Sequence, residues 1–442
     1  MNRIKLIAAI SFYVATLVWA YVAIVSPEFS YFGYSLHWPG SKTVAWVFAL
    51  SLVPATCIPE GISRPSGLIV WWIYGTVYIP SLLLPVLSLT LSYAQLLPLQ
   101  GAMLLSMLWL ILLTRMRGLA LPQLRMSPRI FWPSVFLVWA GGLAFVYLHF
   151  NVTTLAANLA SLFAGGSEYT IRTAYLDRLS QAGRLLGYTV GQVGEAIGPF
   201  LVAYALVYRK RWLLAAGVAG QLLIFAVMGA KSIFFSTFFL ALVYVMFRRS
   251  KKNFGLVLAL TLTCVVFLAA GVDALTNGVY FSSITTRRTL MDPGLLTGFY
   301  YEHYSQAAHA GLGYHFSRGG EAVPAPSYEI GLVYFGNEHI DANANLWAEG
   351  FADFGFAGIA GFTLLLSGIV WFYDSVSSRR KLELAVTLFA MQAFDFSNSA
   401  PLTTLITHGG IASALLIWCA PVGEAEIEAG EEVLPEESAV AA

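Results

Sequence analysis

The chain has 442 residues, of which 58% are hydrophobic and 11% are charged, and its formal net charge is +1. A soluble domain normally carries about 25% charged residues, so this composition excludes a water-soluble globular protein. The net charge identifies no partner, and we expect no nucleic-acid binding. The cysteines Cys57, Cys264 and Cys419 fall inside apolar runs, which predicts neither a disulfide framework nor a thiolate metal site.

Apolar runs close to the length of about 20 residues that a bilayer requires predict about twelve transmembrane helices. These runs are residues 4-25, 43-58, 67-87, 95-114, 130-149, 186-208, 213-229, 232-247, 254-272, 346-373, 383-396 and 402-420. We therefore expect an all-α polytopic membrane protein with a single transmembrane domain over residues 1-421.

Lys and Arg residues between the runs predict the orientation, because cytoplasmic loops carry an excess of both. Clusters such as "RKR" at 209–211, "RRSKK" at 248–252 and "SSRRK" at 377–381 fall on one face of the predicted span order. That face is predicted to be cytoplasmic, with both termini inside the cell. The acidic segment 422-442 is predicted to be a disordered cytoplasmic tail.

Two long loops, about 150-185 and 273-345, then lie on the outer side. Several basic residues occur in these loops or in a short outer turn, against the charge rule: Arg172, Arg178, Arg184, Lys231, Arg287, Arg288 and Arg318. They indicate either an anionic ligand at this surface or pairing with loop carboxylates and lipid phosphates. Lys231 has apolar flanks and could also be a lysine whose ammonium group reaches the interface from a turn.

The two loops share a spacing. Arg172 is followed by ten residues and Gly183 in "RTAYLDRLSQAG", and Arg287 is followed by ten residues and Gly298 in "RRTLMDPGLLTG". With this pattern the chain resembles the Wzy-type O-antigen polymerases, bacterial inner-membrane proteins whose two large periplasmic loops each carry it. The resemblance extends to "GISRPSGLIVWWIYGTVYIPSLLL" and "DANANLWAEGFADFGFAGIAG".

The resemblance implies an architecture and a function. A protein of this family is expected to have a GT-C-like glycosyltransferase architecture and to polymerise undecaprenyl-diphosphate-linked repeat units at the periplasmic face of the inner membrane. It would release undecaprenyl diphosphate and need neither a cofactor nor a metal. Its partners would be the lipid-linked glycans, the lipid bilayer and, potentially, a chain-length regulator protein.

Two other functions stay open. O-antigen ligases carry a signature of His, Asn, nine residues, Gly, two residues, Gly and Thr. Asn345, Gly355 and Gly358 match that spacing, whereas Ala344 and Ile359 replace the His and the Thr. His339 lies a few residues upstream and keeps the ligase alternative open. A polysaccharide flippase or exporter is less favoured, because the spans contain few charges and show no repeated halves.

The diphosphate leaving group of the expected reaction calls for cations at the outer interface, because charge-assisted hydrogen bonds to phosphate oxygens are strong. The candidates are Arg172, Arg178, Lys231, Arg287 and Arg288, together with Gly183 and Gly298 of the shared spacing. We expect Arg287 of the adjacent pair to make the contact.

The acceptor hydroxyl needs a general base within hydrogen-bond reach. The candidate bases are Glu349, His339, Asp341 and Glu195, and further outer-face residues are Asp177, Glu302, His303, His315 and Asp395. Glu195 could equally be neutral and hydrogen-bonded between helices. Glu349 lies four residues after Asn345 and four before Asp353, which predicts one polar stripe on a helix.

Sugars bind on aromatic faces and polar edges. Tyr300, Trp347 and Asn345 are therefore candidates for contacts with the glycan. Because aromatic residues also gather at membrane interfaces without binding sugars, an anchoring role is the alternative for the two rings.

Overall fold

The computed structural model describes residues 3–149 apart from 117, 120, 123 and 125, residue 175, residues 184–316 and residues 324–421. These residues form helices and no strand, which confirms the predicted all-α class for this part of the chain. The predicted site residues Arg172, Arg178 and Gly183 and the predicted tail 422-442 lie outside the described residues.

Contacts divide the chain into two compact units. Unit 1 comprises Met1–Arg117, Arg249–Trp371 and Ala393–Leu402, and unit 2 comprises Gly118–Arg248, Phe372–Gln392 and Thr403–Ala442. The expected single transmembrane domain over residues 1-421 stays a prediction.

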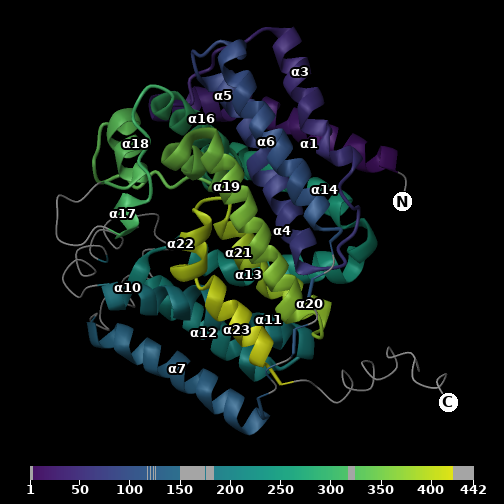
Figure 1. Cartoon of the computed structure of the whole chain (residues 1–442), viewed down its shortest axis with the longest axis vertical. Helices are drawn as coiled ribbons and strands as arrows, with labels where there is room; N and C mark the ends of the chain where they lie inside the picture. Colours follow the sequence, from purple (N-terminus) through teal and green to yellow (C-terminus); the bar gives the residue numbers. More distant parts are fainter. Residues whose placement is uncertain are drawn as a thin grey trace, which may run out of the picture. The chain divides into compact units, whose positions relative to one another are not determined.

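Unit 1 contains the predicted outer loop 273-345 and the N-terminal helices (Figure 1). Its first half consists of α1 (Arg3–Ala20), η1 (Tyr21–Val25), α2 (Ser26–Phe29), η2 (Ser30–Phe32), α3 (Ser41–Leu52), η3 (Pro54–Thr56), α4 (Pro65–Ile73), η4 (Tyr74–Tyr78), α5 (Ile79–Ser88) and α6 (Tyr93–Leu113). Its second half consists of η6 (Lys251–Asn253), α14 (Phe254–Thr276), α15 (Tyr280–Ser282), η7 (Ser283–Met291), α16 (Asp292–Tyr304), α17 (Gly313–Phe316), α18 (Pro326–Phe335) and most of α19 (Leu346–Ser377).

Unit 2 contains α7 (Pro128–His149), α10 (Arg184–Gly191), η5 (Gln192–Ile197), α11 (Gly198–Tyr208), α12 (Arg211–Met228), nearly all of α13 (Lys231–Ser250), α20 (Leu382–Leu388) and α23 (Gly410–Cys419). The short helices α21 (Ala390–Asp395) and α22 (Pro401–Ile406) run across the boundaries between the units. One hydrophobic core of this unit joins Leu143 and Val146 of α7 to Val190 of α10 and to Ile224 and Phe225 of α12.

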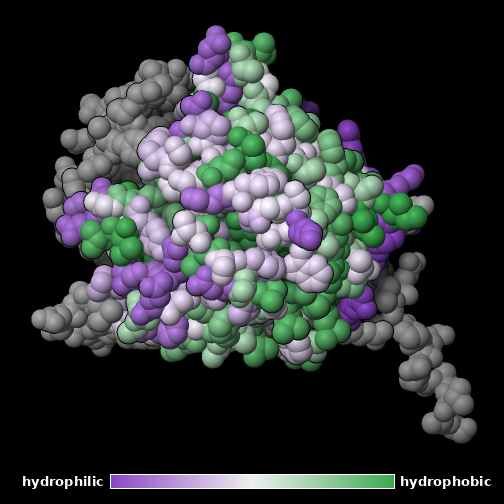
Figure 2. All heavy atoms as spheres, turned by 90° about the horizontal axis from the view of Figure 1, so that it is seen from above, coloured by the Kyte–Doolittle hydropathy of each residue, from purple (hydrophilic) through white to green (hydrophobic). Residues whose placement is uncertain are grey.

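Eight helical segments among the described residues are long and apolar enough to cross a membrane. They are Arg3–Phe32, Pro65–Ser88, Tyr93–Leu113, Pro128–His149, Leu185–Tyr208, Arg211–Met228, Lys231–Thr276 and Leu346–Ser377. Large hydrophobic side chains such as Leu105, Leu137 and Leu268 are exposed on them, and Figure 2 shows hydrophobic residues spread over much of the face that it draws. The length and composition of these helices are those of a membrane protein. The total of twelve spans stays a prediction.

Three predicted spans coincide with shorter or interrupted helices. The predicted span 43-58 overlaps α3, which begins at Ser41 and ends before Pro54. The predicted span 383-396 is divided between α20 and α21, and 402-420 is divided between α22 and α23. The break before α23 occurs at Gly409, whose φ of 72° lies in the left-handed region that glycine adopts without strain.

The outer loop predicted over 273-345 is largely helical, and α16 within it is almost entirely buried. This helix packs against α5 (Figure 1). The approach is close because glycines face α5: a Cβ at position 294 would lie 2.4 Å from the Pro80 carbonyl oxygen, and one at position 298 would lie 3.0 Å from Leu89. The helix α16 therefore forms part of the interior of unit 1, and the candidate site is built along it.

Candidate functional site

Arg287 and Arg288 lie on a continuous helical run, Tyr280 to Tyr304, which is made of α15, η7 and α16. Asp273, near the end of α14, caps the start of this run. Its Oδ1 accepts a hydrogen bond of 2.9 Å from the Phe281 amide, and its Oδ2 accepts one of 2.6 Å from the Ser282 amide. A carboxylate satisfies amides that a helix leaves without partners and favours its N-terminus electrostatically. The cap fixes where this helical run begins, at α15.

Arg287 is held on several sides within η7, a π-helix. Its guanidinium lies 4.8 Å from the ring centroid of Phe29 and 5.6 Å from that of Phe32. The Arg287 Nη2 also donates a hydrogen bond of 3.1 Å to Ser283 Oγ. The side chain is only 16% exposed, so Arg287 is a packed cation with a fixed position.

Arg288 differs from its neighbour in exposure. Its Nη1 lies 3.2 Å from Asp292 Oδ2, one helical turn along the chain, and its side chain is 63% exposed. Arg287 Nη1 lies 3.8 Å from the other oxygen of the same carboxylate. Two guanidinium groups thus share one carboxylate, and the group keeps one net positive charge, part of which is open on Arg288.

Tyr34 completes the surroundings of Asp292 by donating a hydrogen bond from its hydroxyl to Oδ1. Burial raises the pKa of Tyr34 well above its usual range, and the negative charge on Asp292 raises it further. Tyr34 is therefore a neutral donor at physiological pH. Tyr34 and Asp292 were not among the predicted site residues, although the four-residue spacing from Arg288 to Asp292 is a signal for an ion pair on a helix.

Asn345 connects this arginine end of α16 to α19. Its Nδ2 donates to the Pro293 carbonyl oxygen at 2.9 Å and to Thr297 Oγ1 at 2.7 Å. Its Oδ1 accepts a hydrogen bond of 3.0 Å from the Trp347 amide at the start of α19. A fully buried side chain thus fixes the first turn of α19 against α16.

A cluster of carboxylates and tyrosines lies farther along α16, around Tyr300. The Tyr300 hydroxyl lies 3.1 Å from the Ala342 carbonyl oxygen and 3.4 Å from Glu349 Oε1, and these two acceptors share its single proton. Burial is the largest cause that raises the pKa of Tyr300, followed by the charges of Glu349 and Asp341. Glu349 is buried, and Asp341 Oδ1 is a buried oxygen without a hydrogen-bond partner among the described residues. The structure therefore brings three predicted residues, Tyr300, Asp341 and Glu349, into one neighbourhood.

The predicted polar stripe of Asn345, Glu349 and Asp353 occupies the helical turns before a break in α19. All three side chains are buried, and Asp353 Oδ2 accepts a hydrogen bond of 3.3 Å from the Tyr314 hydroxyl. The helix loses its regular geometry at Phe354 and at Gly355, whose φ is 62°.

Glycines at the break allow a backbone contact across it. A Cβ at position 358 would lie 1.7 Å from the Gly350 carbonyl oxygen. Two of the three residues that match the ligase spacing, Gly355 and Gly358, therefore have a structural role in this break, and the third, Asn345, caps α19.

Other predicted residues lie elsewhere. The His339 side chain is 85% exposed, and its Nε2 lies 3.8 Å from Glu338 Oε1. Trp347 is fully buried, and its Nε1 donates to Thr363 Oγ1 at 3.1 Å. Gly298 faces α5. These three residues serve surface or packing contacts in this structure.

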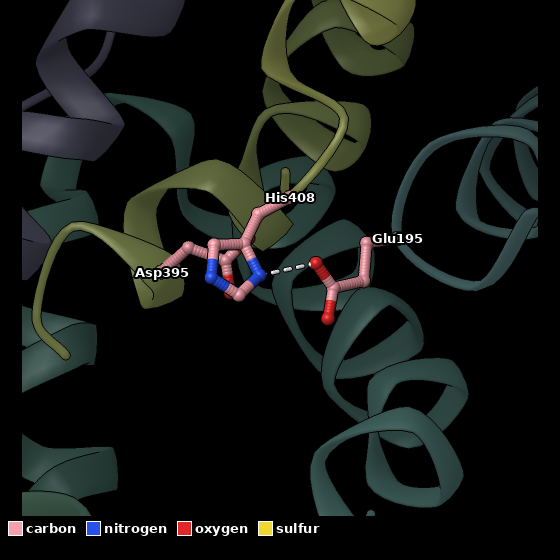
Figure 3. A group of neighbouring side chains, drawn as sticks. All are labelled: Glu195, Asp395 and His408. Carbon is pink, nitrogen blue, oxygen red and sulfur yellow. Dashed lines mark hydrogen bonds and ion pairs between the residues drawn. The ribbon is translucent and has the colours of Figure 1, made fainter. Parts of the chain in front are cut away.

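Two predicted residues belong to unit 2. Lys231 begins α13. Glu195 lies in the π-helix η5, is buried, and pairs with Nδ1 of His408 (Figure 3). The hydrogen-bonded alternative for Glu195 is thus realised within unit 2, with a histidine as its partner.

No protein-family model, curated protein or solved structure matches the chain. The candidate site therefore rests on its own geometry and on the residue patterns of the sequence.

Proposed function

We propose that the protein is a membrane-embedded glycosyltransferase that polymerises undecaprenyl-diphosphate-linked repeat units at the periplasmic face of a bacterial inner membrane. The observation that carries the proposal is the arrangement along α16. A cationic group with an exposed guanidinium lies at its N-terminal end, and a buried cluster of carboxylates and tyrosines lies two turns farther on. Asp292 and Tyr300 are eight residues apart, which is about 12 Å along a helix.

The arginine end suits the leaving group. As the glycosidic bond to the lipid diphosphate breaks, negative charge grows on the diphosphate, and a guanidinium donates strong charge-assisted hydrogen bonds to it. Arg287 is fixed between rings, while Arg288 has N–H groups open to a ligand. Asp292 and Tyr34 hold the pair in place, so little reorganisation would be needed when the diphosphate binds.

The carboxylate cluster suits the acceptor. Glu349 or Asp341 would accept the proton of the acceptor hydroxyl, whose oxygen attacks the anomeric carbon of the donor glycan. The Tyr300 hydroxyl, already hydrogen-bonded to Glu349, orients that carboxylate. The donor already carries its activated leaving group, so the proposed transfer consumes no nucleotide.

The test compares surface polysaccharide from a strain that lacks the chromosomal copy and expresses wild type, Arg287→Ala or Arg288→Ala at equal levels. Wild type should give a ladder of polymer lengths on a gel, and the variants should give a single repeat unit. Arg248→Ala is the matched control, because Arg248 is an exposed arginine whose side chain contacts Tyr244 in unit 2. Normal ladders from both variants would remove the arginine pair from the site.

The second candidate is transfer of a finished glycan to another lipid, as in O-antigen ligases. The match of Asn345, Gly355 and Gly358 to the ligase spacing favours it, although His339 is exposed whereas Glu349 is buried. The same gel separates the two candidates. A strain without ligase attaches no repeat unit to the acceptor lipid, whereas a strain without polymerase still attaches one.

A further inference from the structure

An open hollow lies at the C-terminal end of α16, away from the arginine pair. Its volume is about 360 Å³, and it is lined by Glu302, His303, Gln306, Ala307 and Tyr334. The last turn of α16 and the turn after it supply the first four residues, and α18 supplies Tyr334. Glu302 and His303 were among the outer-face residues considered for the general base, but none of the five belongs to the arginine group or to the cluster around Tyr300.

Its polar groups are held by a defined network. His303 Nε2 lies 2.8 Å from Glu329 Oε1, and the Tyr304 hydroxyl donates a hydrogen bond of 2.8 Å to Glu329 Oε2. The Tyr334 hydroxyl donates a hydrogen bond of 2.9 Å to Glu302 Oε2, and the Tyr334 ring stacks on Phe299 at a centroid distance of 4.1 Å.

The bond to Glu329 fixes the tautomer of neutral His303. A carboxylate accepts, so the proton resides on Nε2 and Nδ1 presents a lone pair. Nδ1 has no hydrogen-bond partner among the described residues. His303 thus lines the hollow with a partly buried ring, 18% exposed, that carries one acceptor nitrogen in its neutral form.

The lining indicates a neutral polyhydroxyl ligand. Among the residues that the structure describes, this lining contains no Lys or Arg, which disfavours a phosphate. Three of the four carboxylate oxygens of Glu302 and Glu329 already accept hydrogen bonds, which weakens the attraction for a cation. What remains is a set of hydrogen-bond acceptors, the Gln306 amide and an aromatic ring, and sugars bind through polar edges and apolar ring faces.

We propose that this hollow is a glycan subsite, which binds a sugar of the acceptor repeat unit at a distance from the reacting bond. The proposal rests on the proposed function, because it places the sugar on the same helix as the arginine pair. Asp292 and His303 are eleven residues apart, or about 16 Å along a helix. That separation is too long for His303 to serve the bond at the diphosphate and suits a sugar farther along the glycan.

The experiment uses full-length protein in lipid nanodiscs and the undecaprenyl-diphosphate-linked repeat unit extracted from the deletion strain. His303→Gln and Glu302→Gln should each raise KM for the repeat unit roughly tenfold, the effect of losing one or two hydrogen bonds, and leave kcat unchanged. Glu338→Gln is the matched control, since Glu338 is 74% exposed and contacts only the exposed His339 among the described residues. Thermal unfolding of each variant checks that it is folded.

A second measurement keeps the subsite testable without transfer activity. The oligosaccharide released from the repeat unit by mild acid should bind wild type and bind His303→Gln about tenfold more weakly. Binding to wild type with no polymer formed would overturn the proposed function and support the subsite. An active enzyme with unchanged KM and unchanged oligosaccharide binding in both variants would overturn the subsite and leave the proposed function standing. A loss of kcat without a change in KM would also overturn it.

Discussion

Asn345 shows how a single side chain can position the candidate site. Its amide makes four hydrogen bonds, to the Pro293 carbonyl oxygen, to Thr297 Oγ1 and from the amides of Trp347 and Ala348. Because a buried group that loses its partner costs about 1 to 3 kcal/mol, Asn345→Ala should lower the free energy of unfolding by about 2 to 3 kcal/mol. Denaturant unfolding in detergent micelles, followed by tryptophan fluorescence, measures this.

Asn343→Ala is the control for that substitution. Asn343 lies two residues away, is exposed, and donates one hydrogen bond of 2.7 Å to Asp341. Its loss should change the free energy of unfolding by less than about 0.5 kcal/mol. Equal effects of the two substitutions would show that Asn345 does not fix α19 against α16.

We expect the loss of Arg287 and the loss of Arg288 to affect stability differently. Arg287 is packed on Phe29 and Phe32, whereas Arg288 is exposed apart from its contact with Asp292. Arg287→Ala should lower the unfolding free energy by about 1 to 2 kcal/mol and reduce transfer. Arg288→Ala should reduce transfer with a change in unfolding free energy below about 1 kcal/mol.

Parallel measurements of unfolding and of polymer formation on the two purified variants check this difference. The two roles would be reversed if Arg288→Ala were the destabilised variant. The spacing to Gly298 favours Arg287 for the diphosphate contact, whereas the exposures of the two side chains give Arg288 the N–H groups that a ligand can reach.

The break in α19 is a feature of one element and can be tested there. Gly358 lies so close to the Gly350 carbonyl oxygen that a methyl group at 358 must displace backbone, and overpacking of this kind costs about 1 to 3 kcal/mol or more. We expect Gly358→Ala to lower the melting temperature and the yield of folded protein. Gly361→Ala, on the same helix with no atom within 4 Å of a Cβ, should be neutral or slightly stabilising.

Size-exclusion profiles and melting curves of the two glycine variants in detergent are the measurements. If Gly361→Ala were as damaging as Gly358→Ala, the effect would come from glycine loss in the helix and not from the contact across the break.

The elements were predictable where apolar length alone decides them. Every predicted span overlaps a helix, because a run of about 20 apolar residues has few alternatives in a membrane. The interruptions at Pro54 and Gly409 were not predicted, since hydropathy averages over single residues that stop a helix. The burial of α16 was missed because its sequence, "DPGLLTGFYYEHY", is only moderately apolar, and its packing depends on Gly294 and Gly298 meeting α5.

Within the site, residue types and local spacings were predictable and long-range pairs were not. The stripe Asn345, Glu349 and Asp353 follows from a four-residue period. In the structure all three side chains are buried, with Glu349 and Asp353 on α19 and Asn345 as the cap at its start. The contact of Tyr300 with Glu349 joins residues 49 apart in sequence, and that of Tyr34 with Asp292 joins residues 258 apart. No spacing rule in one sequence reports such pairs.

The buried tyrosines predict how the stability of the whole protein depends on pH. Burial raises the pKa of Tyr34, Tyr300, Tyr304 and Tyr314 in the folded protein, while in the unfolded chain these phenols titrate near 10. The folded state then binds more protons than the unfolded state above about pH 10, so stability is lost as pH rises from there towards the folded pKa values.

Melting temperatures in detergent between about pH 8 and pH 11.5 measure this loss, and the decline should begin near pH 10. Tyr300→Phe removes one contributing phenol and should make the decline shallower, although it also removes the hydrogen bond to Ala342. A melting temperature that stays constant up to about pH 11 would contradict the assignment of these groups as protonated donors.

The proposed chemistry requires that the C-terminal end of α16 face the periplasm, and the positions of charge predict that it does. Cysteine labelling tests this on a variant without Cys57, Cys264 and Cys419. Ala308→Cys follows α16 and is exposed, and Ser378→Cys is exposed beside the basic cluster at 379–381.

A membrane-impermeant maleimide added to intact cells with a permeabilised outer membrane should label position 308 and not 378, and lysis should make 378 reactive. Labelling of 378 alone would put Arg287 and Arg288 on the cytoplasmic side. Because the charge rule expects positive residues there, no anionic ligand would then be needed to explain the pair.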